Sequence, residues 1–327
     1  MRRRKFMTLL IGAAMGDPRA AIAQSSSKVY RLGTLQPGMP LTEKTPLGLI
    51  LLQRLEERGY AIGKNLSLDA REAAGQVSKL PELARGMKVD KIDVIVAVGF
   101  PTALACKVEN IPTVVAYGAG DPAATHLVDG LSRPGGNITG ISDNAATLST
   151  KRLSLIKLAV PKLQRVAMLW NRNDLGMSMR YEVSANSARS IGVTVQPLGL
   201  REPDDFSGVF EAMNREPPDA ILVVADSLTI LNRKRVFDYA GERHIPALYE
   251  YDYLARDGGL MSYGPDLKES FRRAADLVAG IFEGRRPAEL PFEQPTRYPF
   301  VINLKTAKAM GLDVPPTLVA LADEVIE

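Results

Sequence analysis

Four aromatic residues fall at or just after the ends of predicted strands, where they could contact a small ligand. They are Phe100, Tyr117, Trp170 and Tyr251. Aromatic side chains at such positions can sandwich a flat or apolar molecule, and they rank among the larger contributors to binding per residue. Packing in the core or at its rim is the alternative role for each of them, and it applies most to Trp170.

Polar groups near the same strand ends could bind the charged parts of a ligand. Thr102, together with the backbone amides of the helix that it opens, forms a natural seat for a carboxylate. Asp121, Asp226 and Glu250 could accept hydrogen bonds from an amine or a hydroxyl group. Asp121 and Asp226 could instead cap the helices that follow them, and for Asp121 we favour capping. The complete set of candidate ligand-binding residues is Gln36, Phe100, Thr102, Tyr117, Gly118, Asp121, Asn171, Asp226, Glu250 and Tyr251.

The sequence lacks the residue patterns that mark known catalytic and cofactor sites. Its two histidines, His126 and His244, lie on segments that need not meet. It contains no nucleophile elbow, phosphate-binding loop, dinucleotide-binding fingerprint or clustered His/Cys metal spacing. We therefore expect a binding protein with no catalytic residue, no cofactor and no metal. Two alternatives stay open: an exported α/β enzyme that uses cleft carboxylates such as Asp226 and Glu250, and a ligand-sensing subunit that docks to a receptor.

The candidate residues must be positioned by strands and helices, and the stretch from Asp93 to Asp121 shows this secondary structure most clearly. Asp93–Gly99 is nearly continuous in β-branched residues, which is typical of a strand buried on both faces of a parallel sheet. A short helix from Thr102 to about Val108 leads to a second strand at Thr113–Tyr117. This is a β-α-β unit, and its loops lie at the carboxyl ends of strands, where open α/β sheets bind ligands.

The same unit recurs in the second half of the chain. Asp219–Ala225 and Ile245–Tyr251 repeat the two strands, with a matching leading aspartate, Ile-Pro pair and tyrosine. About 300 residues also exceed what one hydrophobic core usually organises. We predict two Rossmann-like α/β lobes with parallel sheets, whose strand ends oppose each other across a cleft.

Further strands and helices complete each predicted lobe. We expect first strands at Val29–Gly33 and Val166–Trp170, and helices at about Pro46–Arg58, Lys79–Lys88, Met177–Ser190 and Leu267–Glu283. Turn-rich segments at Leu131–Gly140, Gly258–Pro265 and Leu290–Tyr298 are suited to crossovers between the lobes. They predict a three-crossover hinge, a first lobe of residues 28–140 plus 264–291, and a second lobe of residues 141–263 plus 292–327.

Residues 1–23 have the pattern of a signal peptide. A basic Arg2–Lys5 precedes an apolar run from Phe6 to Met15, and Ala21–Ala23 is a small-residue cleavage site. The segment carries five basic residues and one acidic residue, so the chain from Gln24 onward has 36 of each and no net charge. We expect a periplasmic protein with no affinity for nucleic acid, because no broad basic field remains.

Short motifs spread over nearly the whole chain resemble one known family. They are Leu80–Ala84, Asp93–Gly99, Gly120–Pro122, Arg133–Gly140, Gly258–Asp266, Glu293–Thr296, Val301–Ala307 and Pro315–Glu327. With these motifs the chain resembles the substrate-binding proteins of ABC transporters, of the kind typified by tryptophan and tyrosine transport, which have a type I periplasmic-binding fold. The resemblance implies an exported, monomeric protein that closes on a small ligand and delivers it to permease subunits. From the candidate residues we expect that ligand to bear a carboxylate and to be aromatic or amino-acid-like.

Overall fold

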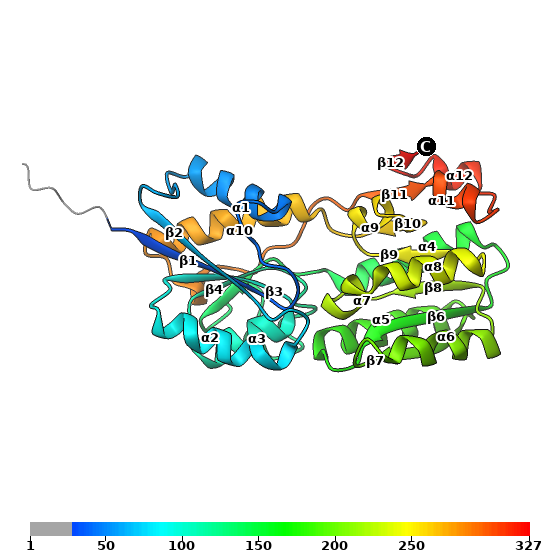
Figure 1. The fold of residues 1–327 in the computed structure, drawn as a ribbon, viewed down its shortest axis with the longest axis horizontal. Helices are drawn as coiled ribbons and strands as arrows, with labels where there is room; N and C mark the ends of the chain where they lie inside the picture. The colour runs from blue at the N-terminus through cyan, green and yellow to red at the C-terminus, as the bar shows by residue number, and fades with distance from the viewer. Residues whose placement is uncertain (1–27) are drawn as a thin grey trace, which may run out of the picture.

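The computed structural model describes residues 28–327, except for the side chains of residues 145 and 146, and shows two α/β lobes side by side (Figure 1). The predicted signal peptide lies outside the described residues. The first lobe is built on a five-stranded parallel sheet in the order β2-β1-β3-β4-β5. Its strands are β1 (Tyr30–Gln36), β2 (Leu66–Glu72), β3 (Val94–Val98), β4 (Thr113–Tyr117) and β5 (Ile138–Gly140).

Helices cover both faces of the first sheet. One face carries α1 (Pro46–Glu57) and α10 (Leu267–Phe282), and the other carries α2 (Leu80–Val89) and α3 (Phe100–Val108). Along β3, Val94 and Val96 pack into the α1/α10 core, whereas Ile95 and Ala97 pack into the α2/α3 core. Because successive strand residues point to opposite faces, a strand covered on both sides must be apolar throughout.

The second lobe is built on a seven-stranded sheet in the order β12-β11-β10-β9-β8-β6-β7. Its strands are β6 (Arg165–Asn171), β7 (Thr194–Leu200), β8 (Ala220–Val223), β9 (Ala247–Tyr249), β10 (Met261–Tyr263), β11 (Phe300–Asn303) and β12 (Glu324–Ile326). Its helices are α4 (Ala145–Ala159), α5 (Leu175–Ser190), α6 (Asp205–Arg215), α7 (Ser227–Leu231), α8 (Arg233–Glu242), α9 (Asp252–Arg256), α11 (Leu304–Ala309) and α12 (Pro316–Val319). All pairs of neighbouring strands are parallel except β10 with β11.

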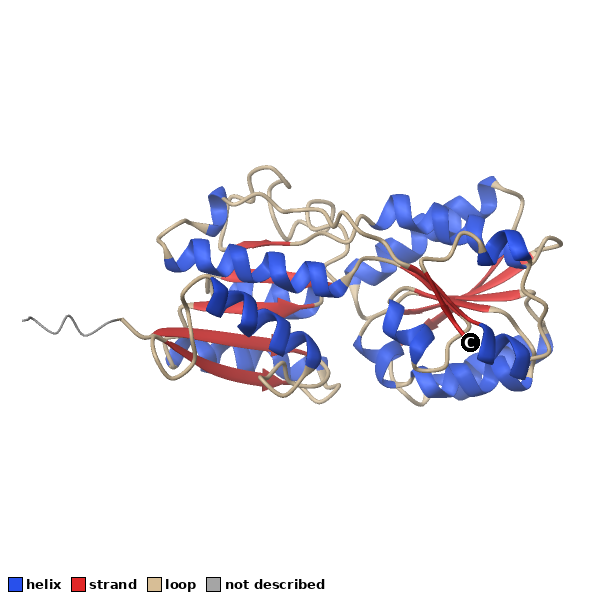
Figure 2. Cartoon of the chain, turned by 90° about the horizontal axis from the view of Figure 1, so that it is seen from above, coloured by secondary structure: helices blue, strands red, loops and turns tan. Residues whose placement is uncertain are grey.

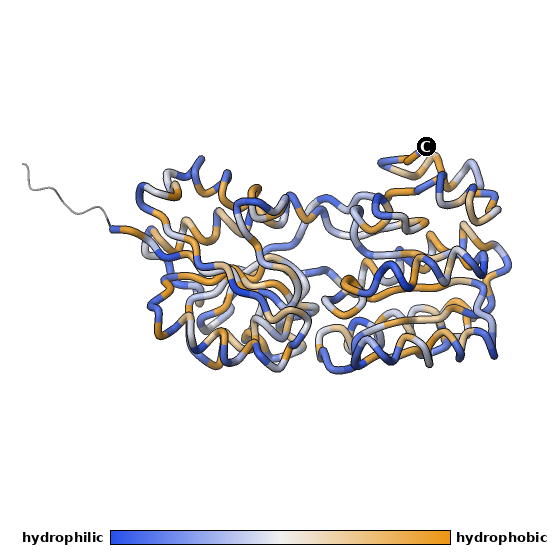
Figure 3. The backbone as a smooth tube through the Cα atoms, viewed as in Figure 1, coloured by the Kyte–Doolittle hydropathy of each residue, from blue (hydrophilic) through white to orange (hydrophobic). Residues whose placement is uncertain are grey.

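The two lobes share one architecture of a central sheet between helical layers. Figure 2 shows helices on both sides of each sheet, and Figure 3 shows hydrophobic colouring along the central strands. The predicted fold class, two mostly parallel α/β sheets with flanking helices, is confirmed. Within residues 28–327, no helix is long and apolar enough to cross a membrane.

The chain passes between the two sheets three times: from β5 to α4, from β10 to α10, and from the short helix η2 (Pro287–Glu289) to β11. In Figure 1, α10 therefore lies beside α1 although more than 200 residues separate them. The first and third crossings are joined, because the Ser142 N–H donates to the Glu293 carbonyl and the Glu293 N–H donates to the Gly140 carbonyl. These crossings are narrow connections compared with the lobes they join.

Several elements differ from their predicted bounds, and one difference affects a candidate site residue. The helix predicted from Thr102 begins at Phe100, because Pro101 fits the first turn, and Phe100 is thereby drawn into the helix. The helix predicted from Met177 begins at Leu175, where the Asp174 carboxylate accepts the Met177 N–H. The segment predicted as the second crossover also contains a strand, β10. Strands β2 and β7 were not predicted, because polar residues interrupt their apolar pattern.

Candidate ligand-binding site

A pocket of about 550 Å³ lies between the lobes and takes its walls from both. The first lobe contributes the residues that follow β1, β3 and β4, and the second lobe contributes those that follow β6, β8 and β9. These are the carboxyl ends of parallel strands, where open α/β sheets place their binding crevices. The pocket therefore sits where two such sheets face each other.

Six of the ten predicted site residues line this pocket. They are Gln36, Tyr117, Gly118, Asn171, Asp226 and Tyr251. Each ends a strand or follows its end within three residues, so the chain's turn into the next helix points it toward the opposite lobe. Their role in binding a ligand stays a prediction, but the structure brings them together from segments far apart in the sequence.

The walls of the pocket are largely apolar and aromatic. The rings of Tyr117 and Tyr251 meet edge to face with centroids 5.4 Å apart, and this contact spans the two lobes. Tyr253 stacks on Tyr251 with a centroid distance of 6.0 Å. Burial raises the pKa of all three phenols, so they stay neutral at physiological pH. Aliphatic and proline side chains complete these walls: Pro37, Met39, Pro40, Leu41, Leu47, Val77, Val98, Pro101, Ile230, Leu231 and Leu267.

Four carboxylates of the second lobe line the pocket, and two of them, Asp252 and Asp257, are paired with Arg256 and Arg233. The other two, Asp226 and Asp174, cap helices. Asp226 caps α7 by accepting the Thr229 N–H at 2.9 Å, and it also accepts from the Asn171 side-chain amide at 2.6 Å. Asp174 caps α5 by accepting the Met177 N–H at 3.1 Å. Burial and the nearby charge of Asp226 raise the pKa of Asp174 to about 7, and burial also raises the pKa of Asp226. Each carboxylate would therefore gain from a positively charged group in the pocket.

The structure places four predicted site residues outside the pocket. Phe100 is buried in the α2/α3 core of the first lobe, because α3 begins two residues earlier than expected. Thr102 lies two residues after Phe100 in the same helix, and its side chain is fully buried. Asp121 is exposed and accepts the N–H groups of Ala123 and Ala124 within a turn. No helix lies between β4 and β5, so the prediction that Asp121 caps a helix is wrong. Glu250 is buried between two arginines and is described below.

Glu250 belongs to a buried group of four charges. Its carboxylate accepts from Arg152 Nη1 at 2.8 Å and from Arg180 Nη1, and Arg180 Nη2 donates to Asp143 at 2.5 Å. All four side chains are at most 3% exposed. Two positive and two negative charges balance, so Glu250 is satisfied within the protein and is not available to a ligand. We call Asp143, Arg152, Arg180 and Glu250 the buried charge cluster.

Trp170 also lies outside the pocket lining. It is 8% exposed and stacks on Tyr181, with the ring centroids 3.6 Å apart and the planes nearly parallel. Its neighbours are Met177 and Val224 of the second lobe. Trp170 therefore packs in the core of the second lobe, which was the alternative role expected for it.

Sequence reasoning missed several pocket residues, of which Asp174 is the most informative. Asp174 follows the predicted Val166–Trp170 strand and precedes a helix, which is the same pattern that singled out Asp226. That pattern could have identified it. The apolar residues between Pro37 and Leu47 carry no such signal, because they lie in an irregular loop.

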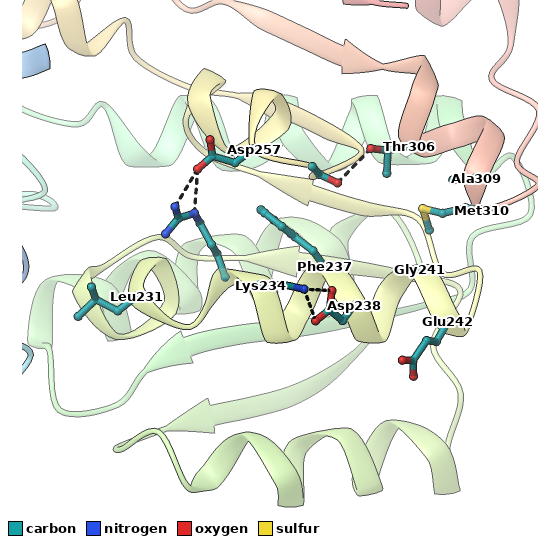
Figure 4. Close-up of a pocket in the computed structure, with 12 residues that line it drawn as sticks. Leu231, Lys234, Phe237, Asp238, Gly241, Glu242, Asp257, Thr306, Ala309 and Met310 are labelled. Atoms are coloured by element: carbon teal, nitrogen blue, oxygen red, sulfur yellow. Dashed lines mark hydrogen bonds and ion pairs between the residues drawn. The ribbon is translucent and has the colours of Figure 1, made fainter.

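A second hollow, of about 750 Å³, lies on the second lobe alone between α8 and α11 (Figure 4). Four of its charged groups are paired with each other, Lys234 with Asp238 at 2.8 Å and Arg233 with Asp257 at 2.9 Å, and Glu242 also lines it. It receives no residue of the first lobe among those that line it. The pocket between the lobes is therefore the candidate binding site.

Comparison with known proteins gives a consistent result. A curated "Tyrosine-binding protein" of Clostridioides difficile (strain R20291) is 25% identical over 313 residues, covering 94% of this chain and 89% of that protein. A crystal structure of a conserved domain protein from Vibrio cholerae is 26% identical with a TM-score of 0.84, and one of an ABC domain in complex with L-Trp from Streptococcus pneumonia is 22% identical with a TM-score of 0.82. Each covers 91% of this chain and is itself covered completely.

The family comparison covers most of the described residues. Residues 47–326 match the family described as ABC transporter substrate binding protein. The match includes both sheets apart from β1, and it includes every pocket residue from Leu47 onward. The chain therefore belongs to the ABC transporter substrate binding protein family.

Proposed function

We propose that the protein captures a small aromatic, amino-acid-like ligand between its lobes in the periplasm and delivers it to the permease of an ABC importer. The observation that carries this proposal is the pocket itself: a largely apolar, tyrosine-walled space between both lobes, with the helix-capping carboxylates Asp174 and Asp226 on one side. A relative named for tyrosine binding and a related structure that holds L-Trp support the same class of ligand.

The ligand's amino group is proposed to bind at Asp226 and Asp174. Both carboxylates line the pocket, and both have a raised pKa because burial disfavours their charge. A ligand ammonium group would supply the missing positive charge and favour the ionised carboxylates. The aromatic part would then lie against Tyr117, Tyr251 and Tyr253.

The ligand's carboxylate is proposed to bind on the side of the first lobe. The N-termini of α1 and α3 open onto the pocket there, through Thr45 and Pro46 and through Gly99 and Pro101. The amino ends of helices carry partial positive charge and favour an anion. Thr102, which the sequence suggested as the seat, is fully buried in α3, so this proposal rests on the helix ends and not on its hydroxyl group.

Binding is proposed to work by closure of the two lobes about the three crossings. We propose a first lobe of residues 28–140 plus 264–291 and a second lobe of residues 141–263 plus 292–327. Ligand contacts with both lobes favour the closed state over the open one, which is the differential affinity that a conformational change requires. The protein acts as a monomer, without chemistry of its own, after export by the signal peptide of residues 1–23.

A panel of matched ligands tests the proposal by thermal shift and calorimetry. L-tryptophan, L-tyrosine and L-phenylalanine are compared with tryptamine, which lacks the carboxylate, and indole-3-propionate, which lacks the amine. We expect stabilisation by an aromatic amino acid, about 2.7 kcal/mol at 100 times its dissociation constant, and weaker binding of both truncated analogues. Recovery of the bound compound unchanged supports a binding protein over an enzyme. If no aromatic amino acid stabilises the protein, the proposed ligand class is wrong.

A further inference from the structure

Helix α5 of the second lobe touches the first lobe at a glycine, Gly176. A Cβ atom added to Gly176 would lie 3.2 Å from the Ala119 carbonyl oxygen and 3.2 Å from the Phe100 Cβ. From the other side, a Cβ atom added to Gly120 would lie 3.1 Å from both the Cα and the carbonyl oxygen of Gly176. The two lobes therefore approach each other backbone to backbone at this point.

The glycine at 176 is not required by the helix. Gly176 does not have a positive φ, and Asp174 caps α5 through the N–H of Met177 whatever residue stands between them. Glycine also lowers the helix propensity of this position relative to alanine. What distinguishes Gly176 is the backbone of the first lobe packed against it.

One turn further along α5, Arg180 binds the same part of the first lobe through Asp143. Residues four apart lie on one face of a helix, so Gly176 and Arg180 point the same way. Arg180 Nη2 donates to Asp143, whose two carboxylate oxygens accept the Gly118 N–H at 2.9 Å and the Gly120 N–H at 2.6 Å. The loop Gly118–Gly120 is thus held by Asp143 and covered by Gly176.

The buried charge cluster anchors this arrangement to the crossings between the lobes. Asp143 lies in the first crossing, between β5 and α4. Arg152 Nε donates to the carbonyl of Tyr263, the last residue of β10, from which the second crossing starts. Glu250 joins the two arginines. The orientation of α5 is therefore set relative to two of the three crossings.

The loop that α5 contacts is also part of the ligand pocket. Gly118 lines the pocket, and the loop continues directly from Tyr117, whose ring meets Tyr251 of the other lobe. We propose that the Gly176–Arg180 face of α5 is a closure contact, through which the second lobe locks onto the loop Gly118–Gly120 and sets ligand affinity without touching the ligand. Gly176, Arg180 and Asp143 are thus positioning residues, and their role in affinity rests on the proposed ligand-binding function.

A cross-linking experiment tests the contact without any ligand. In Phe100→Cys/Gly176→Cys the two Cβ atoms stand about 3.2 Å apart, within a few tenths of an ångström of disulfide geometry. The native Cys106 is buried and its pKa is raised to about 12, so it does not compete. Under mild oxidation we expect a 100–176 disulfide, identified by mass spectrometry of proteolytic fragments. Phe100→Cys/Gly208→Cys is the control, because Gly208 lies on the exposed face of α6. If the first pair cross-links no more than the control, the lobes do not meet at Gly176.

A wedge variant tests the effect on affinity, with L-tryptophan and L-tyrosine as probes. Gly176→Leu should weaken binding at least tenfold, mainly through faster dissociation, and should abolish any decrease in the radius of gyration on ligand addition. Gly208→Leu, a helical glycine whose added Cβ meets no described atom within 4 Å, should bind like the wild type. Gly176→Ala gives a smaller wedge, with an intermediate effect, should Gly176→Leu fail to fold.

The two experiments separate failure of this inference from failure of the proposed function. Wild-type affinity in the Gly176 variants would overturn the closure contact. If the wild type binds neither probe, the proposed ligand class fails, and the cross-linking result alone decides whether the contact exists.

Discussion

At the scale of single residues, the structure separates side chains that the sequence could not tell apart. Asp226 and Glu250 both follow buried strands of the second lobe, yet Asp226 faces the pocket and Glu250 is neutralised by Arg152 and Arg180. Likewise Tyr251 lines the pocket, whereas Phe100 is packed in the core. A charged or aromatic residue at a strand end is a candidate ligand-binding residue. The helices and strands packed against it decide whether its side chain reaches the pocket.

Tyr251 is expected to be an affinity determinant. Tyr251→Ala removes an aromatic wall that meets Tyr117 across the lobes, so binding of L-tryptophan or L-tyrosine should weaken by about 1–3 kcal/mol. Calorimetric titration measures the change. Tyr60→Ala, which alters a tyrosine packed against Tyr30 and Phe282 in the first lobe, is the matched control and should leave the dissociation constant unchanged. Wild-type affinity in Tyr251→Ala would show that the ligand lies elsewhere.

Asp174 should make stability depend on pH. In an unfolded chain an aspartate titrates near pH 3.9, about 3 units below the pKa of about 7 that burial and Asp226 produce here. Between about pH 4 and pH 7 the folded protein holds a proton that the unfolded chain has released, so the free energy of unfolding falls as pH rises.

The variant Asp174→Asn removes this titration and keeps a side chain that can cap α5. We expect its free energy of unfolding to fall less than that of the wild type between pH 4.5 and pH 7.5, as measured by urea denaturation. Titrating groups that do not interact with Asp174 contribute equally to both proteins and cancel in this comparison. Equal pH dependence in the two proteins would mean that Asp174 titrates normally.

At the scale of elements, α5 is held by the buried charge cluster as well as by apolar packing. Burial opposes charge on Arg180, but the attraction of Glu250 and Asp143 outweighs it and raises the pKa of the guanidinium group. Removing one partner of a buried ion pair leaves the others uncompensated, which is more costly than losing an exposed pair. The cluster therefore holds together the end of β9 at Glu250, the end of β10 at Tyr263 and the first crossing at Asp143.

Arg180→Met should lower the free energy of unfolding by roughly 3–5 kcal/mol, because Asp143 and Glu250 would stay buried with less positive charge beside them. Arg58→Met is the comparison, since Arg58 pairs with Asp276 and Glu283 at a partly exposed site and should cost less than about 1 kcal/mol. Chemical denaturation measures both. Similar losses in the two variants would contradict a special role for the cluster.

At the scale of the whole molecule, two lobes joined by narrow crossings place a pocket at their common boundary. Each sheet has its own core on both faces, so either lobe can keep its internal packing while the lobes move relative to each other. The contact of Tyr117 with Tyr251 joins the lobes and lies at the pocket. A ligand there can therefore influence the closure of the whole protein.

Export is the prediction that concerns the whole chain. Cleavage after Ala23 should give a mature protein that begins at Gln24 and carries no net charge, since the basic excess belongs to residues 1–23. Mass spectrometry of the protein from the periplasmic fraction measures its amino terminus. Recovery of a chain that retains Met1 in the cytoplasm would contradict both the signal and the proposed location.

The sequence by itself determined the fold class and the edge of each sheet that forms the site. The β-branched run at Asp93–Gly99 and its repeat at Asp219–Ala225 report burial on both faces, which is a local property and is readable from local pattern. The strand ends then follow, and six of the ten candidates line the pocket because carboxyl ends of parallel strands converge.

Only the tertiary structure decided which strand-end residues are free to meet a ligand. Glu250 is neutralised by Arg180 and Arg152, which are 70 and 98 residues away, and Phe100 lies against Gly176 of the other lobe. The hydrophobic periodicity of the sequence does not predict such contacts, because they depend on how the two sheets are placed against each other. The buried charge cluster and the glycine contact on α5 are consequences of that placement.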